Sequence, residues 1–222
     1  MILTPIRDRP SISYMTSLLC LTRQFSALGI KHDVQFIVGN SCLPMARNML
    51  VAGFLASDYD DAVFIDDDVG FSPEAVWRLS QSPHRVIAGA IRKRSGARPE
   101  TDPFAWGVGF MDGAREANAF EVSYAATAFL KVSRETFMLY ADKHDTRRPA
   151  PFHMDERFAK HYHKFFEFGP NDEGEDVMFC QRWREIGGCV WVDPGIELTH
   201  EGATYYRGNV LAALQPERRA AE

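Results

Sequence analysis

The sequence predicts an α/β protein with a mainly parallel central sheet flanked by helices. Short apolar runs alternate with longer amphipathic segments over residues 2–90, which implies right-handed βαβ units. One of these runs, residues 62–65, is followed directly by Asp66, Asp67 and Asp68. Charges are expected where a buried strand leaves its sheet, at the edge where open α/β sheets bind ligands.

The N-terminal part is regular. The predicted strands cover residues 2–4, 34–38, 62–65 and 86–90, and the predicted helices cover 11–28, 44–57 and 73–80. A polar turn over residues 5–10 follows the first strand, and Gly29 ends the first helix. Ser72 and Pro73 already supply the start of the third helix, so the aspartate triplet is not needed for capping.

The C-terminal part is less regular. Residues 92–119 are rich in glycine, proline and charge, which predicts a long functional loop with little regular structure. A second irregular stretch, rich in aromatic residues and histidine, covers residues 144–170. The remaining expectations are strands over 121–132, 189–192 and 196–199, helices over 134–143 and 175–186, and a frayed tail over 215–222.

Composition narrows the class of protein. The chain of 222 residues is 45% apolar, enough for one sizeable core, and its net charge of −5 argues against a general nucleic-acid binder. No apolar run is long enough for a membrane span, and the first residues lack the layout of a signal peptide, so we expect a cytoplasmic protein. Buried free thiols in a reducing compartment are expected for the four widely spaced cysteines, Cys20, Cys42, Cys180 and Cys189.

The aspartate triplet is the strongest chemical signal. Three like charges in a row repel one another unless a cation or an array of donors offsets them. Mn²⁺ or Mg²⁺ prefers oxygen ligands and keeps positions for water and substrate phosphate, so one or two of these carboxylates suit such an ion. The alternative is a solvated turn, because aspartate is common in turns.

Other candidate residues lie at strand ends and helix starts. Glu175 and Asp176 open the helix predicted at 175–186, where they either serve helix-end electrostatics or provide a general base for a reacting hydroxyl. His200 follows a short apolar strand and is either solvent-facing or a metal ligand. Arg47, early in a helix, and Lys93, within the basic run 92–94, are either surface cations or phosphate contacts.

Taken together, these segments resemble the GT-A glycosyltransferases, most closely the family-2-like enzymes of bacteria and phages. The resemblance covers residues 2 to about 202 and depends on the order and spacing of motifs that are individually short. The matching segments are Ile2–Pro5, Ala46–Asn48, Phe64–Asp68, Gly174–Cys180, Trp191–Pro194 and His200. It implies a single GT-A (Rossmann-like) domain over 1–214, with a nucleotide-binding half over 1–91 and a small antiparallel acceptor-side portion within 92–214.

The resemblance also implies roles for individual residues. Asp68 and His200 are expected to bind Mn²⁺ or Mg²⁺, and Asp66 to hold the ribose or the donor sugar. The register of this DxD motif is open, because Asp67 can replace either neighbour. The remaining nucleotide-sugar contacts are expected from Thr4, Pro5, Arg7, Arg47 and Lys93. Asp176 is expected to deprotonate the acceptor, while Glu175 supports it or binds acceptor.

The implied activity is metal-dependent transfer of a sugar from a nucleotide-diphosphate sugar to an acceptor hydroxyl, by inverting single displacement. A UDP- or GDP-sugar is the favoured donor, and a glycan or another hydroxyl compound is the acceptor. The acidic balance disfavours a nucleic-acid acceptor. If the gene is viral, the site of action is the host cytoplasm.

Two other classes remain open. A sugar-phosphate nucleotidyltransferase shares this kind of sheet, but it would need a glycine-rich loop where residues 5–10 have no glycine. A non-catalytic carbohydrate-binding protein on the same fold would lack donor hydrolysis. Residues 124–129 lack the glycines expected beside an acceptor, and residues 144–170 match no pattern of the family.

Overall fold

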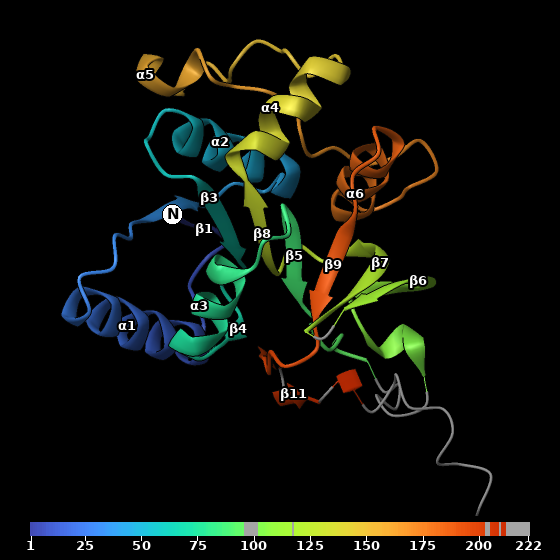
Figure 1. Ribbon diagram of the computed structural model, residues 1–222. Helices are drawn as coiled ribbons and strands as arrows, with labels where there is room; N and C mark the ends of the chain where they lie inside the picture. The colour runs from blue at the N-terminus through green and yellow to red at the C-terminus, as the bar shows by residue number, and fades with distance from the viewer. Residues whose placement is uncertain (96–101, 117, 203–204, 209, 212–222) are drawn as a thin grey trace, which may run out of the picture.

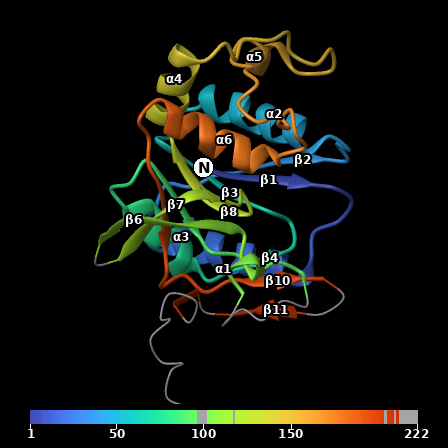
Figure 2. The same cartoon turned by 90° about the vertical axis from the view of Figure 1, so that its right-hand side faces the viewer.

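The computed structural model describes residues 1–95, 102–116, 118–202, 205–208 and 210–211. An eight-stranded sheet with the order β2-β1-β3-β8-β5-β9-β7-β6 runs through the molecule (Figure 1). A smaller sheet with the order β11-β10-β4 lies below it in Figure 2. The strands are Ile2–Ile6 (β1), Val34–Val38 (β2), Asp61–Ile65 (β3), Val69–Gly70 (β4), Val86–Gly89 (β5), Val108–Glu116 (β6), Ala119–Ala125 (β7), Phe129–Ser133 (β8), Val190–Asp193 (β9), Thr199–Glu201 (β10) and Tyr205–Arg207 (β11).

The large sheet is mixed but mostly parallel. β1 pairs in parallel with β2 and β3, and β5 pairs in parallel with β9. β8 is antiparallel to both of its neighbours, β3 and β5, and β7 is antiparallel to β9 and β6. Within the large sheet, all strands except β7 and β8 therefore run in one direction, which confirms the predicted α/β class and the mainly parallel sheet.

Helices cover both faces of this sheet (Figure 2). They are Ile12–Ala27 (α1), Leu43–Leu55 (α2), Pro73–Gln81 (α3), Arg134–Lys143 (α4), Glu156–Ala159 (α5) and Glu175–Glu185 (α6). One core lies between the sheet and α2, α4 and α6, and includes Phe54, Phe137 and Phe179. The second core lies between the opposite face and α1 and α3, and includes Leu21 and Leu79.

Serine caps set the start of three helices close to where the sequence predicts them. In each case the serine hydroxyl accepts a hydrogen bond from the backbone N–H three residues later, which satisfies an otherwise unpaired donor. The pairs are Ser11 with Tyr14, Ser72 with Ala75 and Ser133 with Thr136.

The first strand is longer than predicted. β1 continues to Ile6, so Pro5 lies inside the strand and not in a polar turn over residues 5–10. Proline lacks an N–H, and it is tolerated where a strand has a free side. β1 pairs with β3 only at Ile2 and Leu3, while its pairing with β2 includes Pro5.

The predicted long loop over residues 92–119 is partly wrong. Within it, β6 forms an antiparallel pair with β7 at the edge of the large sheet. The glycines that suggested a loop instead allow close packing, because a Cβ on Gly109 would lie 2.2 Å from Ser123 Oγ. Most residues of β6 are exposed, so the strand lacks the apolar pattern of a core strand.

Two further strand predictions need correction. Residues 121–132 form the end of β7, a turn and most of β8, and not one strand. The strand expected at 196–199 forms later, as β10 over Thr199–Glu201, and β11 was not predicted. The tail expected at 215–222 lies outside the described residues.

The stretch 144–170 is irregular as predicted, apart from the short helix α5. Three of its aromatic residues belong to the core. Phe165 and Phe166 have exposed fractions of 1% and 0% and pack with Phe137 and Phe179, and Tyr162 is also buried. Phe152, by contrast, is fully exposed.

The thiols differ from the expectation of burial. All four cysteines are free, but Cys42 and Cys189 are exposed and Cys20 is half-buried, so only Cys180 matches the prediction. Among the described residues, no helix combines the length and apolar character that a membrane span needs.

Candidate functional site

The aspartate triplet forms the turn between β3 and β4. The backbone N–H of Asp66 donates to the Ala128 carbonyl at 3.0 Å, and Val69 N–H donates back to the Asp66 carbonyl at 3.2 Å. The buried residues of β3 end at Ile65, so the three acids follow directly where the strand leaves the core. The turn then points the three side chains at different partners.

Asp66 belongs to a buried cluster with Arg47 and Glu175. Nη2 of Arg47 lies 2.9 Å and 3.3 Å from the two carboxylate oxygens of Asp66, and Nη1 donates to Glu175. Arg47 lies in the second turn of α2 and Glu175 in the first turn of α6, and their side chains are only 2% and 9% exposed. Arg47, expected to be either a surface cation or a phosphate contact, is therefore a buried cation between two acids.

Burial and the neighbouring charges shift the pKa values of Arg47 and Glu175 in this cluster. Burial alone lowers the pKa of Arg47, but the carboxylates of Asp66 and Glu175 more than offset it, so its pKa is raised. Burial raises the pKa of Glu175, and Asp176 and Asp66 add to this effect against the opposing charge of Arg47. The guanidinium therefore stays charged and provides the positive charge that keeps the neighbouring carboxylates together.

Asp67 points toward the segment after β1. Its Oδ2 accepts a hydrogen bond of 3.2 Å from the backbone N–H of Arg7, and its carbonyl accepts one of 2.8 Å from Ser11 N–H. Burial raises the pKa of Asp67. Asp67 therefore connects residues 7–11, which lead into α1, to the acidic turn. The sequence does not indicate this contact.

Asp68 and His200 lie together. β4 pairs with β10 so that Val69 is opposite His200, and Glu201 N–H donates to the Asp68 carbonyl at 2.8 Å. This pairing brings Asp68 Oδ1 to 3.5 Å from His200 Nε2. The two residues predicted to share a metal ion therefore face each other from neighbouring backbone segments.

The imidazole of His200 has a defined tautomer. Its Nδ1 lies 2.8 Å from the Arg92 carbonyl, which can only accept, so Nδ1 carries the proton. Burial lowers the pKa of His200, with the Arg94 charge acting in the same direction. The neutral ring then presents the Nε2 lone pair to the carboxylate of Asp68.

This arrangement fits a divalent cation. Asp68 Oδ1 and His200 Nε2, 3.5 Å apart, are close enough for both to contact one cation. A carboxylate and a neutral imidazole are donors that Mn²⁺ accepts, and Mg²⁺ commonly takes one or two protein ligands with substrate phosphate. No group of three or more His, Cys, Asp or Glu side chains is arranged to hold a metal within the described parts of the chain.

The first-strand residues are placed differently from the expectation. Thr4 is fully buried within β1, and its hydroxyl is 2.7 Å from the hydroxyl of Tyr14 on α1. Pro5 is also buried in β1, so neither side chain is part of an open loop. Arg7 and Lys93 are exposed.

Asp176 is more accessible than its neighbour Glu175. Asp176 is half-buried, and its Oδ1 accepts a hydrogen bond of 2.8 Å from the backbone N–H of Val177. Gly174 leaves room for this carboxylate, since a Cβ at residue 174 would lie 2.7 Å from Asp176 Oδ1. The acidic pair therefore divides into a buried ion-pair partner, Glu175, and a reachable carboxylate, Asp176.

Two residues of the site were missed by the sequence analysis. Arg94 forms an ion pair with Oδ2 of Asp68, although only Lys93 of the basic run 92–94 was singled out. Tyr14 is the hydrogen-bond partner of Thr4. The basic run was a usable signal for Arg94, whereas nothing in the sequence distinguishes Tyr14 from other core aromatics.

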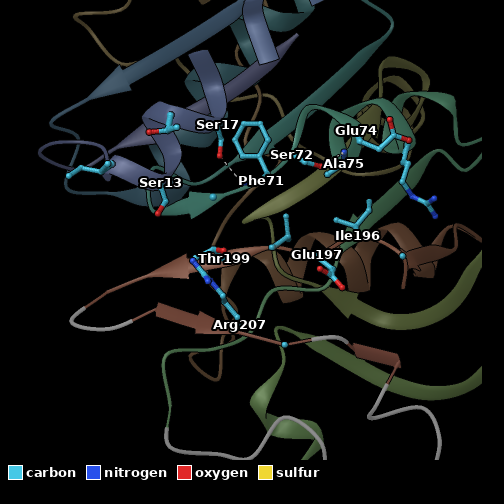
Figure 3. A pocket seen from close by; sticks show the side chains of 17 residues that line it. Ser13, Ser17, Phe71, Ser72, Glu74, Ala75, Ile196, Glu197, Thr199 and Arg207 are labelled. Carbon is cyan, nitrogen blue, oxygen red and sulfur yellow. Dashed lines mark hydrogen bonds between the residues drawn. The ribbon is translucent and has the colours of Figure 1, made fainter. Parts of the chain in front are cut away.

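A groove of about 950 Å³ is lined by Gly70 of β4 and Thr199 of β10, and the acidic turn is not part of its lining (Figure 3). Ser13 and Ser17 of α1 lie on one wall, and Thr199 and Arg207 lie on the other. None of the predicted site residues lines this groove. We therefore place the candidate site at the acidic turn, where ionisable groups from distant segments meet.

Comparisons with known proteins support the fold. No protein-family model matches the chain, and no curated protein sequence matches it. Among solved structures, the chain is similar to the crystal structure of A197 from STIV, with a TM-score of 0.58 and 16% sequence identity. The similarity covers 95% of this chain and 90% of A197, and at this identity it shows a shared fold alone.

Proposed function

We propose that this protein is a metal-dependent glycosyltransferase with a GT-A fold. It transfers a sugar from a nucleotide-diphosphate sugar to an acceptor hydroxyl. One observation carries the proposal: Asp68 Oδ1 lies 3.5 Å from His200 Nε2, next to the cluster of Arg47, Asp66 and Glu175. Neither a solvated turn nor helix-end electrostatics accounts for this convergence of residues from distant parts of the chain.

In the proposed reaction, Asp68 and His200 hold Mn²⁺ or Mg²⁺. Such an ion, when bound, offsets the charge that builds up on the departing nucleoside diphosphate. Asp66 keeps lone pairs free for a ribose or sugar hydroxyl, because Arg47 donates to its oxygens through a single nitrogen. Arg47 thus acts by orienting Asp66, and not by the direct nucleotide contact that was expected.

Asp176 is the proposed general base. It sits at the start of α6, which is anchored in the core by Phe179 and Trp183, so the carboxylate is held by a rigid element. A base must reach the proton it removes, and Asp176 is more exposed than Glu175. Glu175 instead holds Arg47. Single displacement by a hydroxyl activated in this way inverts the anomeric centre.

Ligand-induced stabilisation tests the proposal. UDP, GDP and their sugars are screened by thermal shift with and without Mn²⁺, and we expect one nucleotide class to raise the melting temperature only with the metal. Asp68→Asn should remove this shift. Asp58→Asn is the matched control, because Asp58 carries the same charge but pairs with Lys31 on the surface.

The outcomes separate the alternatives. A stabilised protein that never releases nucleoside diphosphate would be a non-catalytic binder. Formation of a nucleotide sugar from a nucleoside triphosphate and a sugar phosphate would identify a nucleotidyltransferase. Absence of any shift with all nucleotides, with and without Mn²⁺, would contradict the proposed function.

A further inference from the structure

Arg94 occupies the position next to the proposed cation. Its guanidinium forms an ion pair with Asp68 Oδ2, while His200 Nε2 lies 3.5 Å from the other oxygen, Oδ1. The two oxygens of Asp68 therefore face the guanidinium of Arg94 on one side and the imidazole of His200 on the other. The carboxylate already has a counter-ion supplied by the chain itself.

The backbone before Arg94 is fixed to the same site. The Arg92 carbonyl accepts a hydrogen bond of 2.8 Å from His200 Nδ1, and Lys93 N–H donates to the Ala105 carbonyl at 2.7 Å. The stem of Arg94 passes over Gly202, where an added Cβ would lie 3.0 Å from Arg94 Cδ. The guanidinium is therefore delivered to Asp68 by anchored backbone and by a glycine that leaves it space.

The ion pair between Arg94 and Asp68 is accessible to solvent. Arg94 is 39% exposed and Asp68 is 29% exposed, so their ion pair is open to solvent and is individually weak. A divalent cation held by Asp68 and His200 would lie beside the guanidinium, and like charges at such short range repel. The metal and Arg94 therefore compete for Asp68, and the flexible partner is the one that leaves.

A displaced guanidinium has an obvious new partner in the proposed reaction. The two phosphates of a nucleotide-diphosphate sugar would be bound to the same cation and would bring negative charge to this side of Asp68. Arginine binds phosphate through parallel N–H donors. Because the arm of Arg94 starts from the fixed residues 92–93, only its side chain has to turn to make this contact.

We propose that Arg94 is an exchangeable counter-ion, which neutralises Asp68 before the metal binds and binds the donor diphosphate afterwards. This inference rests on the proposed function and adds to it a residue that holds the leaving group. It assigns the phosphate contact to Arg94 in place of Lys93, the residue of the basic run that was expected to make it. The chemical class recognised is a nucleoside diphosphate on a divalent cation.

Two binding measurements with opposite signs test this proposal. Mn²⁺ binding without nucleotide is measured by electron paramagnetic resonance of the free ion, and Arg94→Gln should bind Mn²⁺ about 3- to 10-fold more tightly because the competitor is gone. Binding of UDP and GDP at saturating Mn²⁺ is measured by calorimetry. There Arg94→Gln should weaken binding of the preferred diphosphate by about 10-fold, since a charge-assisted contact is lost.

Control variants distinguish a specific role from a general effect of charge. Lys93→Gln removes the same charge one residue away and should leave Mn²⁺ affinity near that of the natural protein. Arg94→Lys keeps the charge and should retain competition with Mn²⁺, while its diphosphate binding falls only partly because the two-pronged contact is lost.

The outcomes separate this proposal from the function on which it rests. If the natural protein binds neither Mn²⁺ nor any nucleoside diphosphate, the proposed function fails and this inference fails with it. If the natural protein binds both, but Arg94→Gln weakens both or changes neither, only the role of Arg94 is overturned. A purely structural role would weaken both ligands together.

Discussion

Arg47 and Glu175, which are 128 residues apart in the sequence, form a buried ion pair beside Asp66. This contact joins α2 to α6 across one core of the molecule and holds the acidic turn after β3 in place. It links the stability of the fold to the geometry of the candidate site, because the same guanidinium contacts both carboxylates.

Removing this guanidinium should destabilise the protein strongly. Arg47→Met leaves the buried Glu175 and the half-buried Asp66 without their counter-ion, and such a change costs about 3–5 kcal/mol. The free energy of unfolding in urea measures the effect. Arg47→Met with Glu175→Gln should recover part of the loss, since the second change removes one of the unpaired charges.

An exposed ion pair provides the comparison. Arg85 and Glu135 also form a two-pronged pair, but both side chains are about half-exposed. Arg85→Met should cost less than about 1 kcal/mol. Equal losses for the two arginine variants would contradict the view that burial makes the Arg47 pair important.

The two acids at the start of α6 should differ in what they affect. Asp176→Asn should lower kcat for sugar transfer by about 10²- to 10⁴-fold, the usual contribution of a general base, with the fold intact. Glu175→Gln should instead lower the melting temperature, because it leaves Arg47 with one fewer counter-charge. Steady-state kinetics and thermal unfolding of both variants separate these effects.

The outcome that would contradict this division is equally clear. If Asp176→Asn retains its kcat while Glu175→Gln loses it without any change in melting temperature, the base is Glu175. Donor binding by Asp176→Asn should stay near that of the natural protein, because this carboxylate is proposed to act on the acceptor.

The aromatic residues of 144–170 should divide by burial. Phe166 is fully buried against Phe64 and Phe179, so Phe166→Ala should cost about 3–5 kcal/mol through lost burial and the cavity it leaves. Phe152 is fully exposed, so Phe152→Ala should change stability by less than about 0.5 kcal/mol. Denaturant unfolding of both variants tests this, and a large loss for Phe152→Ala would contradict the fold of this stretch.

Stability should fall on mild acidification. His84 stacks on Trp191 with ring centroids 4.2 Å apart, and burial lowers its pKa from the ordinary 6.5, against the opposing effect of Glu116. The unfolded chain then binds this proton at a higher pH than the folded one. Protonation of His84 therefore begins to destabilise the folded protein as the pH drops through 6.5. This loss of stability grows until the pH reaches the lowered pKa of His84 in the folded state.

Replacing the ring isolates this contribution. Burial also lowers the pKa of His161, His163 and His200, so His84→Gln should reduce the slope of melting temperature against pH and not abolish it. Thermal unfolding between about pH 7.5 and 5.5 measures this slope. An unchanged slope in His84→Gln would show that the folded protein tolerates the charged ring.

The sequence predicts the sheet class and most elements because their signals are local. Alternating apolar runs, serine caps and glycine stops act within a few residues, and helices such as Arg134–Lys143 match the prediction. β6 was missed because its residues are mostly exposed and its glycines serve close packing. The position of β8 between β3 and β5 depends on pairing between distant segments, which no local pattern encodes.

The same distinction between local signals and long-range contacts applies to the candidate site. Asp68 follows the end of β3, as predicted, whereas His200 lies inside β10 and not after a strand; the pairing of β10 with β4 brings the two side chains together. The partners of Thr4 and Arg47 depend on where side chains point, so Tyr14 and the pairing with Glu175 could not be foreseen. Residues that the sequence treats as surface contacts are in these cases buried links between elements.

The order of the strands also constrains how this chain acquires its shape during synthesis. β1, β2 and β3 can pair as soon as residue 65 has emerged, but β5 pairs only with β8 and β9. Residues 86–89 therefore wait for the segment 129–133, which inserts between them and β3. A ribosome-bound fragment ending before β8 should expose the β3 edge and be vulnerable to aggregation, which makes this interval of translation the one where a chaperone would matter most.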